Sequence, residues 1–280
     1  MTAGPDTHIG HRIGAMAALA LLLGCDARDT DGSLPLGQVA PCPAPALEDE
    51  ALAHWLCVVG DREAMLDRGD LSAAISLGDL PDDPTLVAVG PIAGLRGEAT
   101  IYDGTVIVTT MRGGKQVVLT GPDAAEAEAV FLAYGSADRW QVVSVPRPLD
   151  GLASVEAFVL EAAEAAGLAT GADAAFPFRL EGTPERLRYH VIFQDTEHGS
   201  VHGRHDRAAH KRSKIPFEAD GLPVRIAGVL VGERDVGRVT HPGRRTHLHA
   251  IVGEAEGAGH VDDLRLPEGM VLFLPRAPGG

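Results

Sequence analysis

HPGRRTHLHAIVGEAEGAGHVDDLRL, residues His241–Leu266, is the stretch that decides the fold. His247 and His249 lie in an apolar run that predicts a strand, and alternate residues of a strand project from the same face of its sheet. Glu254–Gly259 is a glycine-rich turn and His260 opens the next run, so the stretch predicts a hairpin that returns the third imidazole to the first two. Three neutral imidazoles on one rigid face suit a transition metal, most naturally zinc with one position open to water or substrate.

Two other interpretations fit the same histidines. They could be surface side chains without a common ligand, because an H-x-H pair alone is a weak signal. Alternatively, His247-x-His249 with Glu254 five residues on resembles the H-x-H-x(3,4)-E pattern of the cupins, with Glu254 as a ligand and iron or manganese as the metal. The glycine spacing fits that pattern poorly, and a single small barrel leaves the upstream helices and hairpins unexplained.

The chain upstream of the histidine hairpin predicts both strands and helices. Asp103-Gly104 and Gly113-Gly114 lie between β-rich runs and predict two successive hairpins of an antiparallel meander. Hydrophobic spacing and alanine content predict two short helices or one broken helix over 48–69, and single helices over 123–134 and 154–167. Further strands are expected over 85–90, 140–145, 174–180, 186–193 and 224–232.

The N-terminal segment predicts export. Residues 1–25 combine a weakly positive start with an apolar run that is too short to span a membrane. The run ends at Leu22-Leu23-Gly24-Cys25, which resembles a bacterial lipobox, so we expect a lipoprotein anchored through Cys25. Residues 26–46 predict a flexible tether. Outside the cytoplasm, Cys42 and Cys57 could form a disulfide.

Charge narrows the class of partner. With 24 basic and 39 acidic residues the formal net charge is −15, which argues against a nucleic-acid surface and against charge-driven binding to anionic lipid. The segment Thr196–Lys214 holds four histidines and several basic residues; it predicts either a solvated loop or a second metal-binding tract.

The histidine hairpin also resembles a known family. THLHAIVGEAEGAGHVDDLRL is similar to the C-terminal zinc-binding segment of the alpha-acetolactate decarboxylases, where an H-x-H strand is followed by a G-H-V strand opening. GLRGEATIYDG (Gly94–Gly104) resembles the family's L-x-G-E strand, whose glutamate faces the zinc pocket and maps onto Glu98. FPFRLEGTPERLRYHV (Phe176–Val191) is similar to the segment that leads to the family's active-site arginine.

The resemblance implies a fold and a domain layout. It covers roughly residues 50–275 and implies an α/β (α+β) protein of two mixed or antiparallel sheets with flanking helices. The decarboxylase-like domain would span 47–280, with an N-terminal half near 47–170 and a metal-binding half near 171–280. One zinc would lie in a pocket between the sheets, held by His247, His249 and His260.

The chain departs from the family at two positions. Aligned through the Glu181–Thr183 turn, the family's arginine is replaced by His190, and Arg188 or Arg186 on the same strand face could substitute for it. The family also has a glutamate in a longer C-terminal tail, whereas no acidic residue follows Glu268 here.

The resemblance further implies decarboxylation of 2-acetolactate, or of another 2-hydroxy-3-keto acid, to acetoin or its homologue. Zinc would stabilise the enolate, Glu98 would be a fourth ligand or deliver the proton, and His190 or Arg188 would pair with the carboxylate. The alternative is a lipid-tethered metal- or ligand-binding protein on an inactive decarboxylase scaffold. Expected partners are this small acid and the membrane through the lipid on Cys25; a homodimer is possible.

Overall fold

The computed structural model describes residues 1, 39–41, 53–194 and 206–277. By its internal contacts the chain divides into Met1–Ser33 and Leu34–Gly280, and the second unit holds every strand and helix described below. The expected leader and lipobox, and most of the expected tether, lie outside the described residues. No helix within the described part of the chain is long and apolar enough to cross a membrane.

The first sheet has seven strands among the described residues, in the order β1-β2-β9-β4-β5-β6-β7. It is mixed, because β1 pairs parallel to β2 while the other neighbours are antiparallel. Its strands are β1 (Val39–Pro41), β2 (His54–Val59), β4 (Val87–Pro91), β5 (Glu98–Tyr102), β6 (Thr105–Arg112), β7 (Lys115–Thr120) and β9 (Leu132–Ala137).

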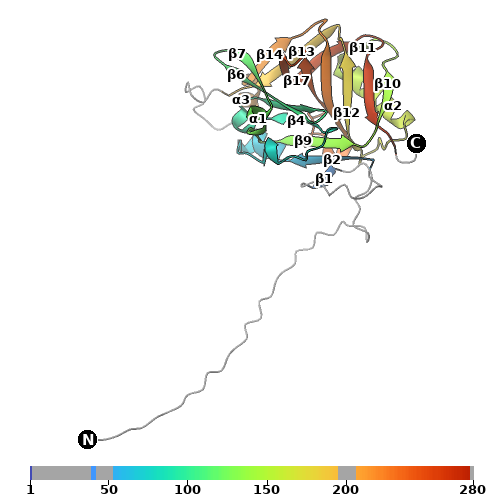
Figure 1. The fold of residues 1–280 in the computed structure, drawn as a ribbon. Helices are drawn as coiled ribbons and strands as arrows, with labels where there is room; N and C mark the ends of the chain where they lie inside the picture. The colour runs from blue at the N-terminus through green and yellow to red at the C-terminus, as the bar shows by residue number, and fades with distance from the viewer. Residues whose placement is uncertain (2–38, 42–52, 195–205, 278–280) are drawn as a thin grey trace. The chain divides into compact units, whose positions relative to one another are not determined.

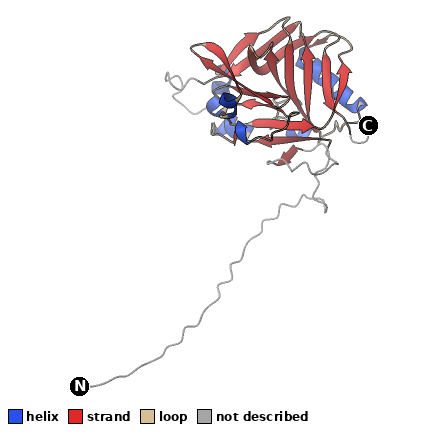
Figure 2. Cartoon of the chain, viewed as in Figure 1, coloured by secondary structure: helices blue, strands red, loops and turns tan. Residues whose placement is uncertain are grey.

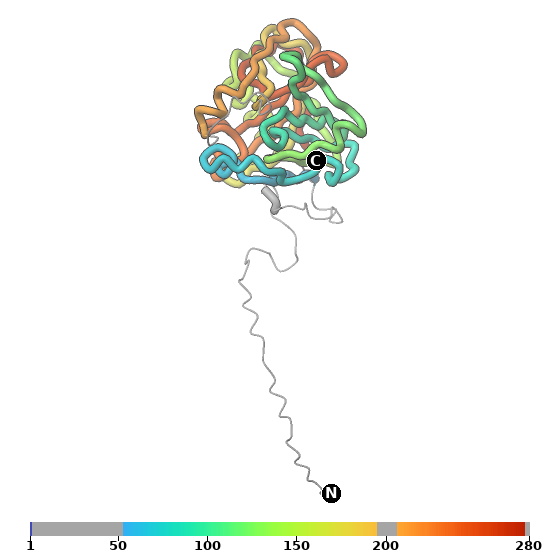
Figure 3. The backbone as a smooth tube through the Cα atoms, turned by 90° about the vertical axis from the view of Figure 1, so that its left-hand side faces the viewer, coloured from blue at the N-terminus to red at the C-terminus, as the bar shows by residue number. Residues whose placement is uncertain are grey.

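The second sheet is antiparallel throughout its described strands, in the order β10-β18-β12-β15-β16-β17-β13-β14, with β11 also paired to β17. Its strands are β10 (Trp140–Ser144), β11 (Leu149–Asp150), β12 (Ala175–Gly182), β13 (Arg186–Ile192), β14 (Lys214–Glu218), β15 (Val224–Val231), β16 (Thr246–Val252), β17 (Gly257–Leu266) and β18 (Val271–Pro275). In Figures 1 and 3 the first sheet is coloured blue to green and the second mainly yellow to red.

Helices are few beside the strands (Figure 2). The helices are α1 (Pro122–Ala125), α2 (Gly151–Ala165) and α3 (Arg207–Arg212), with a π-helical turn η1 (Ala64–Arg68) and short 3-10 turns η2 (Leu77–Asp79), η3 (Ala93–Leu95) and η4 (Glu233–Asp235). A two-stranded sheet joins β3 (Ile75–Ser76) to β8 (Glu128–Ala129). The longest helix, α2, packs its apolar stripe on the second sheet, through Val155, Phe158, Val159, Ala162 and Ala163.

The two sheets face one another across a shared core. Strand alternation divides β16 between two cores: Leu248, Ala250 and Val252 pack toward α2, while Ile251 packs in the core between the sheets. His247 and His249 have the parity of Ile251, so both project toward the first sheet. On the first sheet, Tyr102 lies in the same inter-sheet core, and Glu98 and Thr100 share its parity. Alternation in both sheets therefore aims these side chains at one another.

The predicted fold class is confirmed, and so are most of the predicted elements. The hairpins at Asp103-Gly104 and Gly113-Gly114, the histidine hairpin and the helix near 154–167 are all present. The boundary between the strands of the two sheets falls between Ala137 and Trp140, earlier than the boundary near residue 170 expected for the two halves.

Two helix predictions were wrong. The segment 123–134 contains the short α1, the two-residue strand β8 and the start of β9, whose residues are all buried between β2 and β4. The segment 48–69 contains β2 and the turn η1, and residues 48–52 lie outside the described part. A strand buried on both faces does not alternate apolar and polar residues, so its composition resembles that of a buried helix.

Cys57 is disulfide-bonded. The other two cysteines, Cys25 and Cys42, both lie outside the described residues. Pairing of Cys57 with Cys42 therefore stays a prediction.

Candidate metal centre

Three histidines of the second sheet converge in the space between the sheets. His249 on β16 is paired in register with His260 on β17, and His247 lies two residues earlier on the same face. The Nε2 atom of His247 lies 3.0 Å from the Nδ1 atom of His260, and one ring nitrogen from each of the three residues lies within 4.8 Å of the others. Two nitrogens bound tetrahedrally to one zinc are roughly 3.3 Å apart, so the separation suits a shared metal.

The surroundings of His247 and His249 leave one nitrogen of each ring available to a metal. The Nδ1 atom of His247 donates to the carbonyl of Val239 at 3.2 Å, and the Nδ1 atom of His249 lies 3.1 Å from the hydroxyl of Thr100. The Nε2 atom of His249 is buried and has no hydrogen-bond partner among the described residues. A ligating histidine ordinarily bonds its other ring nitrogen to a neighbouring oxygen, so both rings have the arrangement that ligation requires.

The rings are also in the protonation state that a metal needs. Burial lowers the pKa of His249 to about 3, and it lowers the pKa values of His247 and His260 well below 6.5, with the neighbouring histidines adding to the effect. The three imidazoles are therefore neutral at physiological pH. A neutral ring presents a lone pair, which a cationic ring does not.

Glu98 comes to the same point from the other sheet. Its Oε2 atom lies 3.8 Å from Nε2 of His249, and its Oε1 atom accepts a hydrogen bond from the backbone N–H of Ile192 at 3.1 Å. Burial raises the pKa of Glu98 to about 8, because desolvation of the carboxylate outweighs the hydrogen bond from Ile192. Without a metal, this side chain therefore carries a proton at neutral pH.

His190 lies beside His260 and Glu98 at the edge of the histidine cluster. On β13 it is paired in register with His260, and its Nε2 atom lies 4.0 Å from Oε1 of Glu98. Its Nδ1 atom donates to Asp262 at 2.7 Å, and the other carboxylate oxygen of Asp262 lies 3.6 Å from the ammonium of Lys214. A register shift between β13 and β17 at Arg188/Tyr189 leaves Asp262 without a cross-strand partner. Asp262 thus fixes the tautomer of His190, with the hydrogen on Nδ1 and a lone pair on Nε2.

Sequence reasoning missed two side chains of the site, His241 and Arg62. The ring of His241 lies 4.8 Å from that of His260, and Arg62 donates to Nδ1 of His241 at 3.1 Å. Because arginine can only donate, the remaining hydrogen of a neutral His241 lies on Nε2. Burial lowers the pKa of His241 to about 3, so the ring is neutral. With one nitrogen accepting and the other protonated, His241 is not a fourth ligand in this arrangement.

Asp262 and Thr100 were also missed, although each had a weak signal. Asp262 follows His260 by two residues, and Thr100 follows Glu98 by two, so strand alternation could have placed each beside its partner. Arg62 and His241 had no such signal. Each comes from a segment outside the strands that carry the other groups.

Three other residues considered from the sequence lie elsewhere or have a different setting. Arg188 does not reach the three histidines: its guanidinium is paired with Glu218 and Asp220. Glu254 is exposed in the turn of the hairpin, which overturns the cupin interpretation that needs it as a ligand. His210, on α3, lines the same cavity as Glu98 and His190, whereas the other histidines of Thr196–Lys214 lie outside the described residues.

No protein-family model and no curated protein matches the chain. Solved structures do. A Staphylococcus aureus protein of unknown function, described as similar to alpha-acetolactate decarboxylase, superposes with a TM-score of 0.61 at 14% identity, over 78% of this chain and 84% of that one. Acetolactate decarboxylase from Bacillus subtilis subspecies spizizenii gives 0.61 at 16%, over 79% and 85%. Alpha-acetolactate decarboxylase from Bacillus subtilis strain 168 gives 0.58 at 17%, over 78% and 85%. At these identities the likeness shows the fold, and the fold of this chain is acetolactate decarboxylase-like.

Proposed function

We propose that the protein is a zinc-dependent decarboxylase that converts 2-acetolactate, or a close 2-hydroxy-3-keto acid, to the corresponding hydroxyketone. One observation carries the proposal. A buried cluster of three neutral imidazoles from one sheet meets the carboxyl group of Glu98 from the other sheet, at 3.8 Å from His249. The cluster lies on a fold shared with solved acetolactate decarboxylases.

Zinc fits the donor set better than other common metals. His247, His249 and His260 supply three nitrogen ligands and no sulfur, and three imidazoles with an open position are typical of catalytic zinc. The buried Nε2 atom of His249 would gain the partner that it lacks among the described residues. When bound, the metal would supply a Lewis acid to the oxygen that becomes negative as carbon dioxide leaves.

The chemistry requires one bond to break and one proton to arrive. The bond between the carboxylate carbon and the hydroxyl-bearing carbon breaks, and its electron pair forms the enolate of the neighbouring ketone. The hydroxyl-bearing carbon then takes up a proton to give the product, so the reaction consumes one proton overall. We assign this proton to Glu98, whose carboxyl group is the acid that faces the histidine cluster from the first sheet.

His190 and Asp262 have a supporting role in this scheme. Since the Nδ1–H of His190 is donated to Asp262, its Nε2 atom is a proton acceptor beside Glu98 Oε1. Their separation of 4.0 Å is longer than a hydrogen bond, so His190 would accept the acid proton of Glu98 only after the two side chains approach. In this tautomer it cannot donate to the carboxylate of a substrate, which differs from the role that the family resemblance implies for this position.

The test uses the full-length chain loaded with zinc and mixed with racemic 2-acetolactate, with acetoin as the measured product. We expect the parent to release acetoin, and Glu98→Gln to bind zinc at the parent's stoichiometry with activity lower by about 10²–10⁴-fold. His249→Ala should lose both zinc and activity. Suppose the parent binds one zinc but releases neither acetoin from 2-acetolactate nor the homologous hydroxyketone from 2-aceto-2-hydroxybutyrate. That result would contradict the decarboxylase proposal and favour a binding protein.

A further inference from the structure

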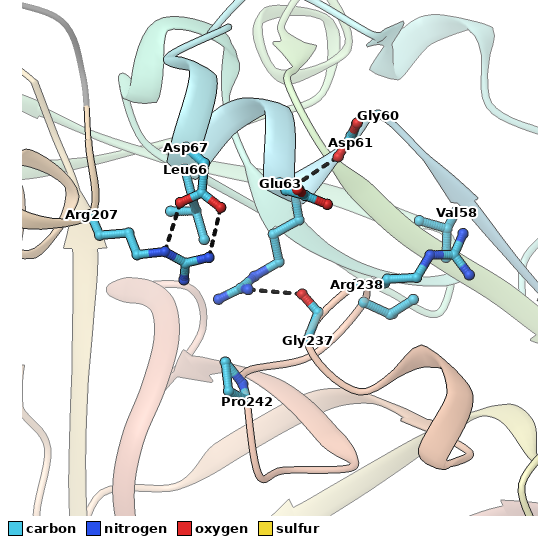
Figure 4. Close-up of a pocket in the computed structure, with 12 residues that line it drawn as sticks. Val58, Gly60, Asp61, Glu63, Leu66, Asp67, Arg207, Gly237, Arg238 and Pro242 are labelled. Atoms are coloured by element: carbon cyan, nitrogen blue, oxygen red, sulfur yellow. Dashed lines mark hydrogen bonds and ion pairs between the residues drawn. The ribbon is translucent and has the colours of Figure 1, made fainter.

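Arg62 is a buried arginine at the boundary between the metal centre and an outer pocket. Its side chain is 9% exposed, and it lines the inner cavity together with Glu98, His190 and His247. It also lines an outer pocket of about 590 Å³ whose wall includes Gly237, Arg238 and Pro242 (Figure 4). A small molecule that enters from the outer pocket would meet this guanidinium next to the histidine cluster.

The guanidinium has only neutral hydrogen-bond partners among the described residues. One nitrogen donates to the carbonyl of Gly237 at 3.0 Å, and another donates to Nδ1 of His241 at 3.1 Å. No carboxylate within the described part of the chain comes within ion-pairing distance, 4.0 Å, of Arg62. An arginine carries five N–H donors, and buried charges in proteins are nearly always paired, so this group has donors and charge left for an anion.

Two acidic residues near Arg62 in the sequence, Asp61 and Asp67, are bound to other groups. Asp67 accepts two hydrogen bonds from Arg207, at 2.7 and 2.8 Å, as Figure 4 shows. Asp61 accepts from Arg68 and from the backbone at the start of η1. Burial lowers the pKa of Arg62 to about 10, which leaves the side chain cationic at neutral pH. The positive charge at the cavity wall therefore persists.

We propose that Arg62 binds the carboxylate of the substrate and thereby selects small 2-hydroxy acid anions for the metal centre. This inference rests on the proposed function and names the group that orients the substrate. His190 cannot do so in the tautomer fixed by Asp262, and Arg188 is paired at the surface. With the carboxylate at Arg62, the hydroxyl and ketone oxygens of the substrate would remain available to a metal held by the three histidines.

The experiment measures binding without turnover. Zinc-loaded full-length protein is titrated calorimetrically with 2-hydroxy-2-methylpropanoate, which has the carboxylate and tertiary hydroxyl but no ketone, and with the uncharged amide of the same acid. We expect the parent to prefer the carboxylate. Arg62→Met should weaken carboxylate binding at least about tenfold, because it removes a charge-assisted hydrogen bond, and leave amide binding within about twofold. The carboxylate affinity of Arg62→Lys should lie between those of the parent and Arg62→Met.

Arg238→Gln is the matched control. It removes a cation from the same outer pocket, but its side chain is 74% exposed and paired with Asp235. We expect carboxylate affinity within about twofold of the parent. Zinc stoichiometry and thermal unfolding of each variant establish that the site and the fold are intact. If Arg62→Met does not fold, the inference is tested by the carboxylate affinity of Arg62→Lys and by the parent's preference for carboxylate over amide.

The outcomes separate this inference from the proposed reaction. If the parent binds carboxylate and amide equally, or if a folded, zinc-loaded Arg62→Met binds the carboxylate as the parent does, the inference is wrong even if acetolactate is decarboxylated. If carboxylate binding depends on Arg62 but no acetoin forms, the anion site stands and the reaction fails. In an active enzyme, Arg62→Met should raise KM by a larger factor than it lowers kcat, as expected for binding energy that is present in the ground state.

Discussion

At the scale of single residues, the site depends on which ring nitrogen of each histidine is already hydrogen-bonded. Val239 and Thr100 occupy Nδ1 of His247 and His249, so a metal would be held through Nε2 of each ring; that atom has no partner among the described residues in His249 and contacts Nδ1 of His260 in His247. Asp262 and Arg62 occupy Nδ1 of His190 and His241 in opposite senses, since one accepts and the other donates. Four histidines with similar burial thereby acquire different chemistry.

Thr100→Val tests whether a hydrogen-bond partner on the outer nitrogen of a ligating histidine affects metal affinity. The change keeps the volume and removes the hydroxyl beside Nδ1 of His249, so we expect zinc affinity to fall about tenfold. The effect should lie at the low end of the usual range because the carbonyl of Ala99 also accepts from this ring. Competition against a chromophoric chelator measures the affinity.

Thr109→Val is the control for that substitution. Thr109 lies opposite Glu98 in the strand pairing, is fully buried, and its hydroxyl has no partner among the described residues. We expect unchanged zinc affinity and no loss of stability. Equal zinc affinities for the parent and Thr100→Val would show that the threonine does not hold His249.

At the scale of elements, the strands β16, β17 and β13 set the positions of His249, His260 and His190. The register pairs His249 with His260 and His260 with His190, so the backbones of three adjacent strands fix the spacing of the rings. Gly259 makes the close approach possible. A Cβ atom at this position would collide with the carbonyl oxygen of His190 and lie 3.0 Å from the ring of Tyr189.

Gly259→Ala should therefore separate β13 from β17. We expect a loss of roughly 2 kcal/mol or more in the free energy of unfolding, because a well-packed sheet has no room for the methyl group. Zinc affinity should fall as His260 moves. Gly171→Ala is the control, because no atom lies within 4 Å of the added carbon and the backbone there is not left-handed. Urea unfolding of both variants makes the comparison; similar values for the two would rule out the close approach.

Local sequence patterns predicted most elements but not all of the site. The dipeptides Asp103-Gly104 and Gly113-Gly114 specify tight turns by backbone preference alone, so the meander could be found without tertiary information. The helix prediction for 123–134 was wrong because the alanines of this segment favour a helix in isolation, whereas β9 is stabilised by neighbouring strands on both sides. Likewise, alternation placed His247 and His249 together, but only the assembled fold brings Arg62 to them.

At the scale of the whole molecule, the candidate metal centre joins the two sheets. The three candidate ligands belong to the second sheet, whereas Glu98 and Thr100 belong to the first. Burying so many neutral histidines makes the stability of the metal-free protein depend on pH. Burial lowers the pKa values of these rings, and that of His54 to about 4, below the value of 6.5 that applies to the unfolded chain.

Metal-free protein should therefore lose stability as the pH falls below about 6.5. In that range the unfolded chain binds protons on these histidines and the folded chain does not, so acid favours unfolding by up to about 1.4 kcal/mol per pH unit for each proton taken up. Glu98 acts in the opposite sense between about pH 4.5 and 8, because the folded state holds its proton, but it is one group against several. Urea unfolding from pH 7.5 to 5 measures the slope; constant stability over this range would contradict the burial of neutral rings.

The most direct measurement is X-ray absorption at the zinc edge on the full-length protein loaded with zinc and dialysed. We expect one zinc per chain with three imidazole nitrogens at about 2.0–2.1 Å, no sulfur ligand, and loss of the bound zinc in His249→Ala. Absence of stoichiometric zinc, or a coordination shell without three imidazoles, would contradict the metal centre and the reaction proposed from it.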